Sequence, residues 1–207
     1  MVRKITFWNL ITLTLIFLVS IFGMYFINYP MKFNLFETLK DIEWKNLLLL
    51  IVGMIALSLI FAMFPFKNLT YGSKFQKILL FFSVLMLLYA FYFTISTLIK
   101  NVLELNKVEN EYIEQAKKDI KNGEVTFKYV GGFTVPEYDK KTYSKIDSIK
   151  KNYGIKYQNT GGIIDYKEIE ARKQYDNFVQ PYLEKRNGKN WEAKMDAEIQ
   201  NLKRDYR

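Results

Sequence analysis

Three long apolar stretches without a charged side chain constrain the fold of this chain more than any other feature. They cover residues 5–27, 47–66 and 78–99. A helix needs about 20 apolar residues to cross a hydrocarbon core of roughly 30 Å, and buried helices of soluble proteins rarely stay apolar on every face for that length. The sequence therefore predicts an α-helical integral membrane protein with three transmembrane helices in direct contact with the lipid bilayer.

The composition changes sharply at Ile99/Lys100. Residues 1–99 contain three of the 21 acidic residues and eight of the 30 basic ones, and all the others follow. A charged segment of this length with both signs interleaved is typical of a folded, solvated domain. We predict a membrane domain over residues 1–99 and an extramembrane α+β domain over residues 100–207.

The first apolar stretch begins directly after Met1-Val-Arg-Lys4, like the start of a secretory signal. It is too long for a signal peptide and no small-x-small cleavage site follows it, so we interpret it as a retained signal anchor. Arg3 and Lys4 at the amino terminus, with three lysines in the short connection over residues 67–77, favour the cytoplasmic side for both. The prediction is a multi-pass protein of a bacterial cytoplasmic (inner) membrane, with a cytoplasmic amino terminus and an extracytoplasmic C-terminal domain.

The connection between the first two apolar stretches carries helix signals. Asn34-x-x-Glu37 can form a capping box, and apolar residues recur at nearly helical spacing between Phe33 and Trp44. A short helix on the membrane surface and a packed interhelical loop both fit this pattern.

The charged domain begins as a continuation of the third apolar helix, which Gly123 is expected to end. The alternating segment EVTFKYV and the FTV at 133–135 surround Gly131-Gly132, a pattern that predicts a small β-hairpin. A helix marked by apolar residues from Tyr143 to Tyr153 follows, and then a short strand over 155–157.

Two further helices are predicted at the C-terminal end. Asp165-x-x-Glu168 forms a capping box at the start of the first, and Pro181 should kink or split it. Its expected buried side chains are Tyr166, Ile169, Phe178, Val179 and Tyr182. Asn190 caps the last helix, whose apolar side carries Trp191, Met195, Ile199, Leu202 and Tyr206.

The sequence contains no cysteine and no histidine. Disulfides, thiolate nucleophiles, Cys/His zinc sites and imidazole acid–base catalysis are therefore excluded. Gly131-Gly132 and Gly161-Gly162 lack the spacing of phosphate-binding loops, and Asp165, Glu168 and Glu170 fit capping better than a metal site. We expect no enzymatic activity, no cofactor and no metal. We also expect no nucleic-acid binding, because the net charge of +9 comes without a basic block.

The side chains that we expect to bind a partner lie around the two Gly-Gly turns: Tyr129, Phe133, Lys156 and Tyr157. Aromatic and basic residues supply most of the binding energy at protein interfaces. The same aromatic residues, with Tyr138 and Tyr166, could instead belong to the core of the domain.

The segment that runs from Glu111-Tyr-Ile through Lys121-Asn-Gly123 and EVTFKYV to Asn152-Tyr-Gly-Ile155 resembles a known type of sequence. It is similar to the C-terminal extracytoplasmic segment of large bacterial multi-pass membrane proteins related to envelope glycosyltransferases. The resemblance implies an outward-facing domain on membrane helices. It does not extend to the many-helix catalytic core of those proteins, and about fifty residues follow it here.

Together these features favour a small polytopic bacterial membrane protein that presents an extracytoplasmic domain to a protein or envelope partner. Immunity, exclusion and envelope-accessory roles all fit. One alternative is a membrane-perturbing effector whose helices form homo-oligomers. The other is an accessory subunit or fragment of a surface-glycan glycosyltransferase system.

Overall fold

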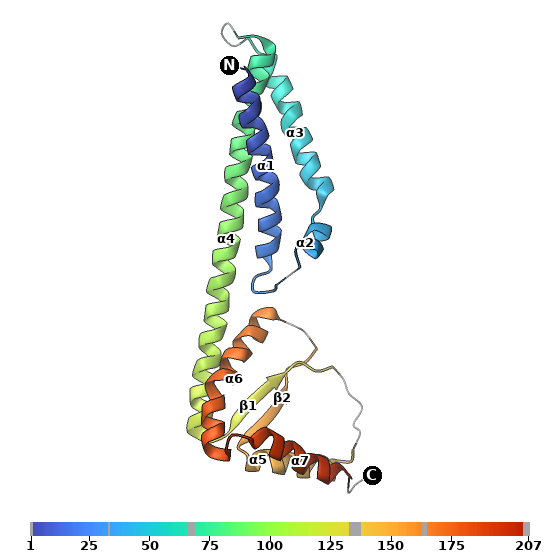
Figure 1. Ribbon diagram of the computed structural model, residues 1–207, viewed down its shortest axis with the longest axis vertical. Helices are drawn as coiled ribbons and strands as arrows, with labels where there is room; N and C mark the ends of the chain where they lie inside the picture. Colours follow the sequence, from blue (N-terminus) through green and yellow to red (C-terminus); the bar gives the residue numbers. More distant parts are fainter. Residues whose placement is uncertain (1, 33, 66–68, 133–137, 163–164, 205–207) are drawn as a thin grey trace. The chain divides into compact units, whose positions relative to one another are not determined.

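The computed structural model describes residues 2–32, 34–65, 69–132, 138–162 and 165–204 (Figure 1). The chain divides into two compact units, Met1–Val102 and Leu103–Arg207, which we call the first and second units. The boundary lies close to the change of composition at Ile99/Lys100. Each unit is described by itself below.

Three helices of the structure are long and apolar enough to cross a membrane: α1 (Val2–Ile27), α3 (Trp44–Ala62) and α4 (Tyr71–Asn122). The three apolar stretches are thus confirmed as helices. Helix α3 ends before the expected residue 66. Pro65 accounts for this, because proline disfavours helical geometry at the residue before it and cannot donate a helical hydrogen bond.

Polar side chains in the first unit are mostly satisfied within their own helices. Ser58 donates to the Met54 carbonyl at 2.7 Å, and Ser83 donates to the Leu79 carbonyl at 2.8 Å. Asn9 instead connects two helices, since its Nδ2 donates to Gln76 Oε1 at 2.7 Å. Such bonds satisfy these side chains internally, as an apolar medium would require.

The connection between α1 and α3 contains a helix, α2 (Leu35–Asp41). Asn34 caps it as expected, because its side chain accepts a hydrogen bond from the Phe36 amide at 3.2 Å. Of the two interpretations of this connection, the structure shows the helix.

The second unit contains the end of α4, then β1 (Val125–Tyr129), α5 (Lys140–Asn152), β2 (Ile155–Asn159), α6 (Tyr166–Asn187) and α7 (Trp191–Arg204). Helix α4 runs without interruption to Asn122, and Gly123 follows with φ of 76°. The expected continuation of the third apolar helix and its stop are confirmed.

The two strands form a parallel pair with Val125 opposite Ile155 and Tyr129 opposite Asn159. Parallel strands need a crossover connection, which α5 supplies. The hairpin prediction therefore missed the partner of β1 that the structure shows, which lies beyond α5. The other half of the expected hairpin, residues 133–135, falls outside the described residues.

The core of the second unit lies between the strands and helices α4 to α7. Trp191 is almost completely buried, as are Val125 and Ile155 on the two strands. The cluster comprises Ala116, Val125, Ile146, Ile155, Tyr175, Val179, Leu183, Trp191, Met195 and Ile199. The expected apolar side of α7 is confirmed at Trp191, Met195 and Ile199.

Helix α6 differs from its prediction in two ways. Its buried side chains are Ala171, Tyr175, Val179 and Leu183, whereas Tyr166 and Phe178 are 43% and 41% exposed. The helix is also not split, since it continues through Pro181. Burial of Val179 and Leu183 on both sides of the proline in one core offsets the loss of one helical hydrogen bond.

Candidate functional site

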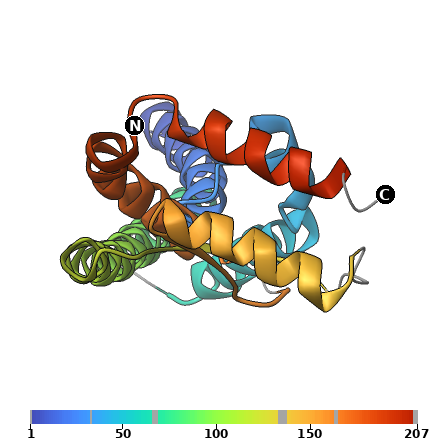
Figure 2. The same cartoon turned by 90° about the horizontal axis from the view of Figure 1, so that it is seen from below.

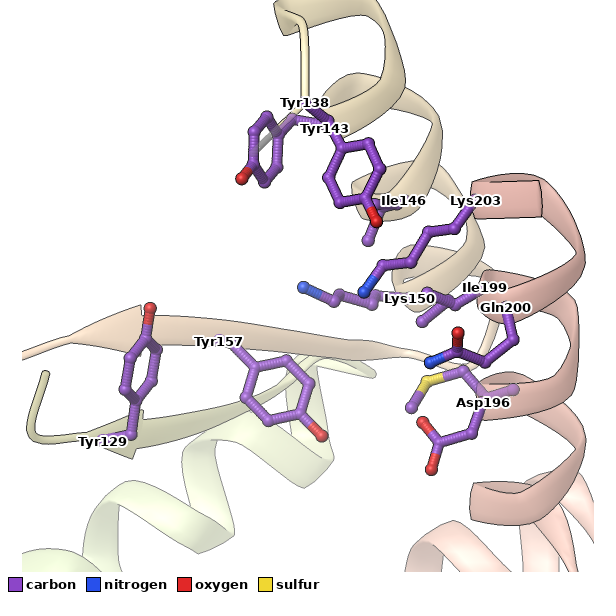
Figure 3. A pocket seen from close by; sticks show the side chains of 11 residues that line it. Tyr129, Tyr138, Tyr143, Ile146, Lys150, Tyr157, Asp196, Ile199, Gln200 and Lys203 are labelled. Carbon is purple, nitrogen blue, oxygen red and sulfur yellow. The ribbon is translucent and has the colours of Figure 1, made fainter. Parts of the chain in front are cut away.

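An open hollow of about 510 Å³ lies in the second unit between the strands, α5 and α7 (Figure 3). Four of the side chains around it are tyrosines, and two are lysines. The full lining is Tyr129, Tyr138, Tyr143, Ile146, Lys150, Tyr157, Met195, Asp196, Ile199, Gln200 and Lys203.

The hollow exists because α5 and β2 diverge from a tight turn (Figure 1). Helix α5 is capped at Tyr153, and Gly154 then takes φ of 70°. Only glycine adopts this conformation without strain. A Cβ at Gly154 would also lie 2.0 Å from Nη1 of Arg186. Helix α7 packs beside α5 (Figure 2) and contributes Met195 and Ile199 to the lining.

Ring and cation contacts orient three of the four tyrosines, Tyr138, Tyr143 and Tyr157. Tyr138 and Tyr143 meet edge to face at 6.2 Å, and Tyr157 stacks on Phe127 at 5.7 Å between ring centroids. The ammonium group of Lys150 lies 5.0 Å from the centroid of Tyr157, and that of Lys203 lies 5.5 Å from the centroid of Tyr138. Rings fixed in this way bind with little loss of side-chain entropy.

The charges around the hollow are unequal. Lys150 and Lys203 reach into it from two different helices, and among the described lining residues Asp196 is the one carboxylate. Burial raises the pKa of the Tyr157 hydroxyl, and the carboxylates of Asp196 and Glu192 act in the same direction. Tyr157 therefore keeps its proton at neutral pH and can donate a hydrogen bond to a ligand.

Two of the four residues expected to bind a partner lie together at this hollow. Tyr129 and Tyr157 line it, with 48% and 42% of their surface exposed. Lys156 lines an adjacent hollow of about 240 Å³ that shares Lys150 and Tyr157. Phe133 lies outside the described residues. The structure thus places these tyrosines at the surface, and their role in binding stays a prediction.

The sequence interpretation missed the contributions of α5 and α7. Tyr143 and Lys150 flank the buried Ile146 at helical spacing, and on α7 Asp196, Gln200 and Lys203 follow the same periodicity. Polar residues next to a buried stripe normally indicate a solvated helix side. Only the packing of α7 beside α5 turns them toward one opening.

The carboxylates considered for a metal site do not gather. Asp165 caps α6 by accepting from the Lys167 amide at 2.8 Å, so the expected N-cap is confirmed. Glu168 bonds to Arg172 at 2.9 Å instead of reaching back to complete the capping box, and Glu170 pairs with Lys173 at 2.7 Å. Across the described residues, no group of three or more acidic side chains could hold a metal ion.

A second polar cluster lies inside the unit and has a structural role. The Asp119 carboxylate is buried and accepts hydrogen bonds from Tyr175 Oη at 2.6 Å, Gln115 Nε2 at 2.6 Å and the Thr126 amide at 3.2 Å. These bonds connect α4, β1 and α6. They satisfy the carboxylate and hold the three elements together.

Comparisons with known proteins found no match to this chain. No family model matches the sequence, and no curated protein or solved structure matches the chain.

Proposed function

We propose that this protein is a membrane-anchored recognition protein. The helices of the first unit hold it in the cytoplasmic membrane of a bacterial cell. The second unit presents the tyrosine-lined hollow to a protein or envelope partner outside the cytoplasm. Immunity, exclusion and envelope-accessory roles share this molecular activity.

The observation that carries the proposal is the hollow itself. Four tyrosines and two lysines from β1, β2, α5, α7 and the segment before α5 converge on one opening, and ring and cation contacts orient three of the tyrosines. Large, rigid aromatic side chains beside an apolar floor are the usual anchors of binding sites. The geometry offers binding surface.

An exchange of the membrane helices tests the proposal. Residues 1–99 are replaced by three unrelated spans of the same orientation, with the helical register kept into residues 100–122. We expect the chimera to restore the wild-type phenotype to a strain that lacks this gene, because an anchor needs only hydrophobic length.

The complementary variant is Tyr157→Ala in the full chain, which should abolish that phenotype while the protein stays folded. Tyr166→Ala is the matched control, since Tyr166 has nearly the same exposure as Tyr157 but lies outside the hollow. Loss of the phenotype in the chimera, with an intact and correctly placed second unit, would refute recognition as the main function.

That outcome would favour the effector alternative, in which specific packing of the membrane helices matters. One feature of the first unit is compatible with it. An apolar crevice of about 290 Å³ lies among α1, α3 and α4, where Gly23 allows a close approach to Thr94. Small residues at such contacts are typical of specific helix association in membranes.

A further inference from the structure

The outer edge of β2 carries backbone groups that point away from the sheet. The Val125 amide donates to the Gly154 carbonyl at 2.8 Å, and the Thr160 amide donates to the Tyr129 carbonyl at 2.9 Å. Successive residues of a strand direct their backbone groups to opposite sides. The even-numbered residues of β2 therefore pair with β1, and Tyr157 and Asn159 direct their N–H and C=O groups outward.

No backbone partner reaches those outward groups within the described part of the chain, where the sheet has two strands. The outer edge of β1 is different. There the Thr126 amide donates to Tyr175 Oη at 3.0 Å and to Asp119 Oδ2 at 3.2 Å. Unpaired groups on a strand edge are a template for another extended chain.

The edge of β2 borders the hollow, which lies between this strand and α5. In Figure 3, Lys150 and Lys203 reach into the hollow on the side of β2 away from β1. Its floor is apolar, formed by Ile146, Met195 and Ile199. A chain added to the edge would lie roughly 4.8 Å from β2, and every second side chain would face this floor.

The charges that line the hollow favour certain side chains in the bound segment. No ion pair involves Lys203 among the residues that the structure describes, and Lys150 is 3.7 Å from Asp147, whose side chain is 75% exposed. Two ammonium groups therefore face the hollow against one carboxylate of its described lining, that of Asp196. An acidic side chain placed between them would form charge-assisted hydrogen bonds.

We propose that the outer edge of β2 binds an extended, acidic segment of a partner protein as an additional strand. Backbone groups of Tyr157 and Asn159 pair with the segment, its alternate side chains lie on the apolar floor, and an acidic residue meets Lys150 and Lys203. This binding mode is known as strand addition, in which backbone bonds supply affinity and side-chain pockets supply specificity. The inference rests on the proposed recognition function and names its partner class.

The test uses the full chain in nanodiscs of phosphatidylcholine and a phage-displayed library of random dodecapeptides. We expect enriched peptides in which apolar and acidic residues alternate. Binding of a synthetic enriched peptide should slow hydrogen exchange at the amides of Tyr157 and Asn159. Methylating alternate backbone nitrogens of that peptide should abolish binding, because the methyl groups remove the donors that pair with β2.

Lys203→Glu should weaken binding of the acidic peptide about tenfold or more, since it replaces an attractive charge by a repulsive one. Lys194→Glu on the same helix is the matched control, because Lys194 is exposed outside the hollow. It should leave the affinity unchanged.

Three results would overturn the inference: an unenriched library, protection at other amides, or binding that survives backbone methylation. An oligosaccharide of uronic acids and a second copy of this chain are tested in parallel. If one of these occupies the hollow and no peptide does, strand addition is wrong while recognition stands. The chimera and the Tyr157→Ala variant separately decide whether recognition is the function.

Discussion

At the scale of single residues, the hydroxyl of Tyr175 is the most constrained polar group of the second unit. It donates to the buried Asp119 carboxylate and accepts from the Thr126 amide. Tyr175→Phe keeps the ring but removes one partner from each group, so we expect the free energy of unfolding to fall by about 1–3 kcal/mol. Chemical unfolding followed by Trp191 fluorescence, in a Trp8→Phe/Trp44→Phe background, measures this change. The exposed Tyr166→Phe is the control, and equal effects of both variants would contradict the assigned role.

We expect the neighbouring Asp176 to make stability depend on pH. Burial raises the pKa of its carboxyl group, and Arg172 opposes that shift only in part. A carboxyl group with a raised folded-state pKa stabilises the fold below the unfolded-state pKa of about 3.9, and this contribution is lost as the pH rises through the folded-state value. Asp176→Asn should therefore raise the unfolding free energy at pH 7, with a smaller gain near pH 4. The exposed Asp147→Asn is the comparison, and a gain that grows toward acid pH would show the opposite sign.

At the scale of elements, α6 carries an internal proline without being split. Pro181 has no amide to donate to the carbonyl of Asn177, one helical turn before it. Pro181→Ala restores this donor in an exposed position, and we expect a gain in unfolding free energy of about 1–3 kcal/mol. Thermal unfolding of the full chain in detergent measures it, with the exposed Lys185→Ala as control. No gain, or a loss, would mean that the proline sets a bend on which the packing of Val179 and Leu183 depends.

At the scale of the whole molecule, the side of the membrane on which the hollow lies decides its class of partner. The basic residues near the amino terminus and around the start of α4 favour the cytoplasm for both. Alkaline phosphatase fused after Arg207 should then be active, whereas a fusion at Leu69–Thr70 should be inactive. The reverse pattern would place the second unit in the cytoplasm and direct the search to intracellular partners.

Local signals in the sequence were sufficient for most elements. Apolar length alone predicted α1, α3 and the first part of α4, because a run without charges of that size has few other structures open to it. Gly123 and Asp165 marked the ends of helices correctly, since each acts through the backbone of its own neighbourhood. Tyr129 and Tyr157 were named as candidate binding residues because they lie beside the two glycine turns, but their proximity to each other was not predicted.

Tertiary structure decided the pairing of the strands, the buried side of α6 and the makeup of the hollow. In a hairpin, β1 would pair with the next segment along the chain. Instead, α5 brings Ile155 beside Val125, and burial of both side chains offsets the entropy cost of closing the longer connection. Likewise, Lys150 and Lys203 are separated by more than fifty residues, and only the packing of α7 beside α5 brings them to one opening. The sequence by itself determined helices, caps and membrane-spanning length because these depend on neighbouring residues. Strand pairing and the binding surface depend on contacts between distant segments, whose energies appear only when the chain is folded.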